Sequence, residues 1–229
     1  MGSYAVTLPV MTTLSLDECR VLGVLVEKAL TTPAQYPLTL NALVNGCNQK
    51  SNRHPVTSLD EDDVLAATDS LRQADLVREV LLSGSRVGKF RHNAREVLGI
   101  DTATLVLLAE LMLRGPQTTG EIRGRASRMH TLESAEAVEH ELQSLIERDP
   151  PLVRQLVPAP GTRAARYVQL LCPDLHPTDA PARPAAAAPV ATVQAHDPGL
   201  AARVDALEAE VSRLKQAVDR LTEMHHQPT

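Results

Sequence analysis

Four basic residues lie within a stretch of ten that contains no acidic residue: Arg86, Lys89, Arg91 and Arg95. Lys and Arg side chains on protruding elements bind the phosphates of nucleic acids, so this cluster favours contact with a polyanion. Residues 77–92 predict a β-hairpin, in which Lys89 and Arg91 point to one face because side chains alternate along a strand. The alternative is that these cations only discourage edge-to-edge pairing of an exposed hairpin.

A polar segment, residues 45–58, supplies a second group of candidate contacts. It is rich in Asn, Gln, Ser, Lys and Arg, and its Lys50, Arg53 and His54 can reach phosphates if the segment lies beside the hairpin. Its amide side chains can bind base edges, or they can cap helix ends and fix the segment in place. We expect the segment as a whole to be a binding surface, because loops on a rigid scaffold commonly carry binding.

Basic side chains also occur in residues 119–128, which contain Arg123, Arg125 and Arg128. They are candidates for DNA contact, and pairing with neighbouring glutamates is an equally good interpretation.

Acidic residues argue against insertion of the third expected helix into the major groove, because four consecutive acids at 60–63 stand at its start. Carboxylates there suit the helix dipole but repel phosphates, so we expect the hairpin and the polar segment to lead any contact.

Other chemistry has little support in the sequence. It contains no Gly-rich phosphate loop, no His-Glu-x-x-His and no paired-cysteine zinc motif, so we expect no catalytic residue, no metal site and no cofactor. Three widely spaced cysteines predict a reducing compartment rather than a disulfide framework. Aromatic residues make up 2%, which argues against base stacking, and the net charge of −5 requires a local basic patch for any nucleic-acid contact.

The apolar residues define the elements that must position these groups. Helical spacing and two capping boxes, Ser15-Leu16-Asp17-Glu18 and Ser58-Leu59-Asp60-Glu61, predict helices at 15–30, 38–47 and 58–76. Strands at 77–82 and 87–92 flank a turn at 83–86. The same order recurs with helices at 105–113, 119–128 and 134–148 and strands at 152–157 and 166–171.

A repeated three-helix unit that ends in a hairpin is the pattern of two winged-helix domains in tandem. We therefore predict a mainly α fold with small β-hairpins (α+β), with winged-helix domains at 14–97 and 98–172. Residues 173–199 hold six prolines and eight alanines, which predict a disordered linker.

The tail, residues 200–224, has a heptad pattern with Val and Leu at alternating steps of four and three. Val at a and Leu at d favour a parallel two-stranded coiled coil, so we expect a C-terminal coiled-coil helix that assists homodimerisation. The alternative is one amphipathic helix that packs on its own domain. The residues predicted to form the dimer seam are Val204, Leu207, Val211, Leu214, Val218 and Leu221.

Residues 47–56, Cys-Asn-Gln-Lys-Ser-Asn-Arg-His-Pro-Val, resemble a signature of the YceH family of uncharacterised bacterial proteins. Gly-Lys-Phe-Arg-His-Asn at 88–93 and Gly-Glu-Ile-Arg-Gly-Arg-Ala at 120–126 are similar to further family motifs, as is Glu27-Lys28 followed by Tyr36-Pro37. The resemblance covers residues 14–173. It implies a tandem winged-helix fold and implies no biochemical activity.

The residues favour a non-enzymatic protein that binds DNA, in transcription or chromosome maintenance, through a basic wing and a polar loop. The alternative is a protein-interaction adaptor on the same fold, which the acidic helix starts suit better. We expect a homodimer, with duplex DNA or a protein as partner and no membrane. Residues 1–11 lack the basic start of a secretory leader and no apolar run approaches 18 residues, so we expect a cytoplasmic location.

Overall fold

The structure is a computed structural model that describes residues 13–81, 87–158, 161, 164–177 and 213. The chain divides into a compact unit, Met1–Pro181, and a second unit, Ala182–Thr229, of which only the helical Arg213 is described. Most of the predicted linker, the hairpin turn with Arg86 and the predicted dimer seam lie outside the described residues. Within the described part of the chain, no helix is both long and apolar enough to cross a membrane.

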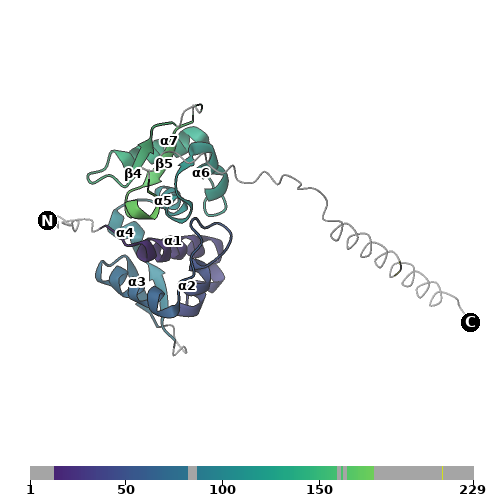
Figure 1. Ribbon diagram of the computed structural model, residues 1–229, viewed down its shortest axis with the longest axis vertical. Coiled ribbons are helices and arrows are strands. Elements are labelled where there is room, and N and C mark those ends of the chain that lie inside the picture. Colours follow the sequence, from purple (N-terminus) through teal and green to yellow (C-terminus); the bar gives the residue numbers. More distant parts are fainter. Residues whose placement is uncertain (1–12, 82–86, 159–160, 162–163, 178–212, 214–229) are drawn as a thin grey trace, which may run out of the picture. The chain divides into compact units, whose positions relative to one another are not determined.

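The first half of the compact unit consists of three α-helices followed by an antiparallel hairpin (Figure 1). The helices are α1 (Leu16–Thr31), α2 (Leu40–Cys47) and α3 (Glu61–Gln73), with a 3-10 turn at Pro33–Gln35 after α1, and the strands are β1 (Val77–Val80) and β2 (Lys89–His92).

Capping boxes fix where two of these helices begin. The Ser15 side chain accepts from the Glu18 amide, and the Glu18 carboxylate accepts from the Ser15 amide, as the sequence predicts. The box predicted at Ser58 is wrong by two residues, because Asp60 caps α3 and Asp63 closes that box. The third helix therefore begins with exposed carboxylates.

The second half repeats the order of the first. A short helix, α4 (Ala94–Leu98), precedes α5 (Thr102–Arg114), β3 (Gln117–Thr118), α6 (Thr119–Ala126), α7 (Ala135–Ile146), β4 (Val153–Leu156), β5 (Arg166–Gln169) and a 3-10 turn at Pro173–Leu175. The prediction of a mainly helical fold with small antiparallel sheets is confirmed. The elements without a counterpart in the prediction are α4, β3 and the two 3-10 turns.

The two halves also share a strand connection in front of their second helix. In the second half, β3 pairs with β5 and completes a three-stranded sheet in the order β3-β5-β4. In the first half, Leu38 forms a single antiparallel bridge with Phe90 on β2. Their backbone hydrogen bonds are 3.1 and 2.7 Å long. Each second helix is thus tied to the last strand of its own hairpin.

One hydrophobic core extends through both halves. Helices α1 and α5 lie side by side at its centre (Figure 1), and a Cβ placed on Gly23 of α1 would lie 3.1 Å from the side chain of Leu113 on α5. Leu22 and Leu107 are among the fully buried side chains of the shared core. The predicted boundary at 97/98 falls inside α4, where Leu98 is buried in that same core.

Residues 173–176, which the composition assigns to the linker, pack on the compact unit. Leu175 and His176 are buried, and His176 Nε2 lies 2.7 Å from the carbonyl oxygen of His54. The His176 ring also lies against Gly115, directly after α5. The compact unit therefore extends beyond the predicted boundary at 172.

Gly115→Ala is expected to lower the free energy of unfolding by about 1–3 kcal/mol. The φ angle of Gly115 is +81°, and an added Cβ would lie 2.5 Å from the His176 ring, so both backbone and packing oppose a side chain. Urea denaturation measures the change. Gly120→Ala is the matched control, since its Cβ meets nothing within 4 Å. Equal stability of Gly115→Ala and the parent chain would contradict this account of the turn.

Candidate functional site

The outward face of the β1–β2 hairpin gathers three cations. The strand register pairs Arg78 with Arg91 and Val80 with Lys89. Residues paired across strands share a face, so the three cations project together, while Phe90 between Lys89 and Arg91 is buried. We call Arg78, Lys89 and Arg91 the basic hairpin face.

The charges of this face are only partly balanced by neighbours. Like charges directly opposite one another destabilise a sheet, and Arg78 and Arg91 form such a pair. Asp75 accepts two hydrogen bonds from Arg78, both 3.1 Å long. Glu79 belongs to the opposite face by register and pairs with Arg72 at 3.3 Å. The outward face thus keeps an excess of positive charge that a phosphate can neutralise.

The polar segment between α2 and α3 is fixed by its own side chains. Asn48 Nδ2 donates to the Leu59 carbonyl at 2.7 Å, and the Leu59 amide donates to Asn48 Oδ1 at 2.8 Å. Asn48 is thus engaged in holding the segment rather than free for base edges. Lys50 is exposed, and the exposed His54 stacks on His176 with ring centroids 6.2 Å apart.

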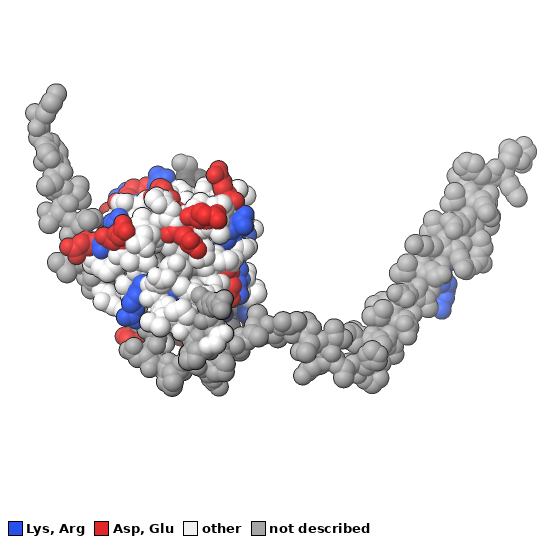
Figure 2. All heavy atoms as spheres, turned by 90° about the horizontal axis from the view of Figure 1, so that it is seen from above, with Lys and Arg blue, Asp and Glu red and all other residues white. Residues whose placement is uncertain are grey.

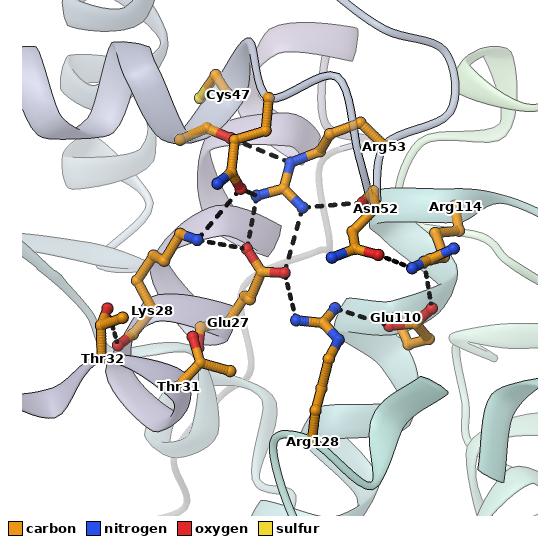
Figure 3. A network of polar contacts seen from close by, with 12 residues as sticks. Glu27, Lys28, Thr31, Thr32, Cys47, Asn52, Arg53, Glu110, Arg114 and Arg128 are labelled. Carbon is orange, nitrogen blue, oxygen red and sulfur yellow. Dashed lines mark hydrogen bonds and ion pairs between the residues drawn. The ribbon is translucent and has the colours of Figure 1, made fainter. Parts of the chain in front are cut away.

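Arg53 lies inside the molecule, contrary to its predicted place among the surface contacts. Its fully buried guanidinium donates to both carboxylate oxygens of Glu27, at 3.2 and 2.5 Å, and to the Gly46 carbonyl at 3.1 Å (Figure 3). A DNA phosphate cannot reach it, because its donors are used within the fold. Arg53 is therefore removed from the candidate contacts.

Ion pairs to two buried carboxylates, Glu27 and Glu110, connect the two halves (Figure 3). Arg128, which follows α6, donates to Glu27 at 2.5 Å and to Glu110 at 3.1 Å. Glu110 also pairs with Arg114 at 2.9 Å, and Arg114 hydrogen-bonds to Asn52 of the polar segment. These contacts join α1, the polar segment, α5 and the end of α6. We call this set the buried ion-pair network: Glu27, Arg53, Glu110, Arg114 and Arg128.

The two carboxylates of the network have shifted pKa values in opposite directions. Burial by itself raises the pKa of Glu27, but the hydrogen bonds and charges of Arg53 and Arg128 outweigh it and lower the pKa to about 2. At Glu110, burial outweighs the neighbouring arginines and raises the pKa. Glu27 is thus fully ionised at neutral pH, which suits a structural anion rather than a group that exchanges protons.

The two arginines predicted as contacts on α6 also have partners within the second half. Arg123 donates to the carbonyls of Leu132 and Glu133, at 3.4 and 3.0 Å. Arg125 donates to Gln117 at 2.7 Å and pairs with Glu121 at 3.5 Å. The structure does not bring either of them into contact with the basic hairpin face. Pairing with a neighbouring glutamate, one of the two interpretations of the sequence, is present for Arg125.

Acidic and basic side chains are interspersed on the face of the compact unit seen in Figure 2. Among the described residues, no group of three His, Cys, Asp or Glu side chains is placed to hold a metal ion. Cys47 is buried, as expected for a thiol on an apolar helix face. The predicted dimer seam, residues 204–221, cannot be placed because it lies outside the described residues.

Comparison with known proteins identifies relatives of the chain. The profile of a family described as "Protein of unknown function, DUF480" matches residues 14–162. A UPF0502 protein of Koribacter versatilis is 46% identical over 199 residues, which cover 86% of this chain and 88% of the relative. One from Citrifermentans bemidjiense is 54% identical over 167 residues, covering 71% and 76%. One from Burkholderia pseudomallei strain 668 is 44% identical over 213 residues, covering 92% and 88%.

Proposed function

This chain belongs to the DUF480 family of uncharacterised bacterial proteins, also named UPF0502 and YceH, and on that premise we propose that it binds duplex DNA through the basic hairpin face. In this proposal the protein is a non-enzymatic, cytoplasmic DNA-binding factor that acts in transcription or chromosome maintenance. The observation that carries it is the convergence of the exposed Arg78 and Arg91 and the half-buried Lys89 on the outward side of the hairpin.

The proposal includes a tandem winged-helix fold, in which each hairpin is a wing. The repeated order of three helices and a hairpin supports it. The strand contact before each second helix, Leu38 with Phe90 and β3 with β5, supports it in both halves. A wing is a protruding element whose cations contact phosphates beside a groove, so the first wing is suited to backbone contact rather than base readout.

The start of α3 favours contact led by the wing. Glu61, Asp62 and Asp63 are exposed in its first turn, and phosphates would be repelled if this end entered a major groove. Sequence preference is therefore expected to be weak. The exposed Lys50 and His54, with Arg123 and Arg125, are secondary candidates for contact, and Arg86 in the hairpin turn is a further candidate outside the described residues.

Fluorescence anisotropy with a short labelled duplex of mixed sequence tests the proposal. A protein that binds through phosphates is expected to have a Kd of about 10⁻⁴–10⁻⁶ M near physiological salt, and a lower Kd as the salt is reduced. Failure to bind any duplex at low salt would reject DNA binding. A Kd that does not change with salt would reject a phosphate-led contact.

A second candidate function is that of a protein-interaction adaptor. The exposed acids at the start of α3, together with Leu65, which is 39% exposed on the same helix, favour a partner protein with a basic and apolar surface. Affinity purification of the full chain at low and high salt, with nuclease added, distinguishes the two. A stoichiometric partner protein that stays bound at high salt supports the adaptor function. If no such partner is found and the chain binds DNA in a salt-dependent way, the result supports DNA binding.

We also propose that the chain is a homodimer joined through its heptad tail. Leu207→Asp with Leu214→Asp places charges in the seam and is expected to halve the mass measured by sedimentation equilibrium. Ser212→Asp with Gln216→Asp adds the same two charges at positions b and f, which face away from the seam, and as the control it should retain the parent mass. A dimer mass in the Leu207→Asp, Leu214→Asp chain would show that another surface joins the protomers.

A further inference from the structure

Two of the three cysteines approach each other from distant parts of the chain. Cys19 lies in α1 and Cys172 follows β5, and both are buried free thiols. A backbone hydrogen bond of 2.7 Å from the Leu14 amide to the Leu171 carbonyl draws the start of α1 to the residue before Cys172. The two sulfur atoms are within hydrogen-bonding reach of one another.

We propose that Cys19 and Cys172 form a reversible dithiol–disulfide site that a hydroperoxide oxidises, joining α1 covalently to the segment after β5. The disulfide would join two segments that are already neighbours, because α1 packs on the 3-10 turn directly after Cys172. The linked segment, residues 172–176, also carries His176, which rests on Gly115 and on the His54 carbonyl. Oxidation would therefore fix a segment that spans both halves.

The surroundings distinguish the two sulfurs. The Leu175 amide donates to the Cys172 carbonyl at 3.3 Å, which folds the segment after Cys172 back on itself, and the two thiols interact with one another. The pKa of Cys172 is lowered to about 7 chiefly by the bond from Cys19, whereas the pKa of Cys19 is raised well above its ordinary value by that bond and by burial. Cys172 is accordingly the nucleophilic thiolate, and Cys19 is the thiol that resolves the intermediate.

The reaction balances with one hydrogen peroxide per disulfide. The Cys172 thiolate attacks one peroxide oxygen, the O–O bond breaks, and a sulfenic acid forms while hydroxide leaves and takes up a proton. The Cys19 sulfur then attacks the sulfenic sulfur, the S–O bond breaks, and the Cys19 proton leaves with the hydroxyl group as a second water. Two thiols lose two electrons in total, and the peroxide accepts both. A thiol reductant reverses the change by disulfide exchange.

Cys47 supplies an internal reference for the proposal. It is a buried thiol on α2, and burial raises its pKa to about 12. A general reactivity of buried thiols in this protein would include Cys47, whereas the proposed site excludes it. Burial of the pair also predicts reaction with water-sized hydrogen peroxide in preference to bulky alkylating reagents.

The experiment treats the folded full-length chain with hydrogen peroxide, then unfolds it, alkylates the remaining thiols and maps the peptides by non-reducing mass spectrometry. The expected result is loss of two of the three thiols, a crosslinked pair of peptides containing Cys19 and Cys172, and full recovery of thiols after reduction. Cys47→Ala should form the same crosslink. In Cys172→Ser no crosslink should form and both remaining thiols should stay reduced. In Cys19→Ser, Cys172 should be oxidised to the sulfenic acid or its overoxidised forms without a crosslink.

Three alkylated thiols after prolonged exposure to peroxide would overturn the proposal. So would a crosslink that contains Cys47, or a Cys172 that goes to sulfinic acid while Cys19 stays reduced. Because the parent chain and Cys47→Ala each give a decisive result, the test does not depend on whether the serine variants fold. It is also independent of DNA binding.

Discussion

Glu27→Gln is expected to lower the free energy of unfolding by about 3–5 kcal/mol, the usual effect of removing one partner from a buried ion pair. The buried carboxylate of Glu27 accepts from two guanidinium groups: that of Arg53, which is fully buried, and that of Arg128, whose side chain is 29% exposed. The amide of Gln keeps the size and some hydrogen bonds but leaves the buried Arg53 without its carboxylate partner, while Arg128 keeps Glu110. Urea denaturation at neutral pH measures the loss.

Two further variants make this measurement specific. Glu96→Gln removes an exposed carboxylate that pairs with Arg95 at 3.5 Å, and it should change the stability by less than about 1 kcal/mol. Glu27→Leu with Arg53→Met removes both partners of the buried pair. The stability lost in this double variant should be smaller than the sum of the losses in Glu27→Leu alone and Arg53→Met alone. A change in Glu27→Gln no larger than that in Glu96→Gln would contradict the assigned role of the network.

The same pair predicts how stability depends on pH. Because the folded pKa of Glu27 is about 2 and its ordinary value is 4.5, its contribution is complete above about pH 5 and is lost as pH falls towards 2. The stability difference between the parent and Glu27→Gln should therefore narrow as the solution is acidified. The raised pKa of Glu110 makes its own contribution to stability change with pH in the opposite direction. Glu110 is present in both the parent and Glu27→Gln, so its contribution cancels in the stability difference between them.

Lys89→Ala with Arg91→Ala is expected to weaken duplex binding by about 100-fold at 0.1 M salt. Each phosphate contact contributes about 0.9 to the slope of log K against log salt, which is about tenfold per contact at this concentration. Fluorescence anisotropy measures the affinity, and circular dichroism checks that the variant is folded. Arg78→Ala, which the strand register adds to the set, should weaken binding by a similar factor per residue.

The control removes two other exposed cations from the same half of the chain. Arg95 belongs to the basic stretch 86–95 but lies on α4, where it pairs with Glu96, and Arg72 pairs with Asp69 and with Glu79 on the inward side of β1. Neither lies on the basic hairpin face, and Arg72→Ala with Arg95→Ala changes the net charge equally. Its affinity is expected to fall by less than about tenfold, since only the long-range field changes. Equal losses in the two double variants would show that overall charge, and not the hairpin face, determines binding.

The sequence predicts the elements of this fold well because their signals are local. Helical spacing and the Ser15 box locate α1, and the strand patterns locate both hairpins. Asp60–Asp63 and Ser58–Glu61 have the same box spacing, and only the backbone of the folded chain selects the former. The two-residue β3 and the single-turn helix α4 are missed, because two residues show no alternation and one turn shows no helical repeat.

The candidate site is less predictable because its contacts are distant in sequence. Glu27 and Arg128 are 101 residues apart, and nothing near Arg53 in the sequence shows that it is buried against Glu27. A signal does exist at Glu110, the one acid in the apolar stretch 105–113, which indicates a buried carboxylate in need of a cation. Arg78 joins the hairpin face only through the register, which the sequence does not determine.

The most direct test of wing-led DNA binding is the slope of log K against log salt for the parent chain and for Lys89→Ala with Arg91→Ala. The slope counts phosphate contacts, so removal of two contacts should reduce its magnitude by about 1.8, while Arg72→Ala with Arg95→Ala should leave it unchanged. The same slope in all three chains would contradict the proposal, because phosphates would then be bound elsewhere on the protein.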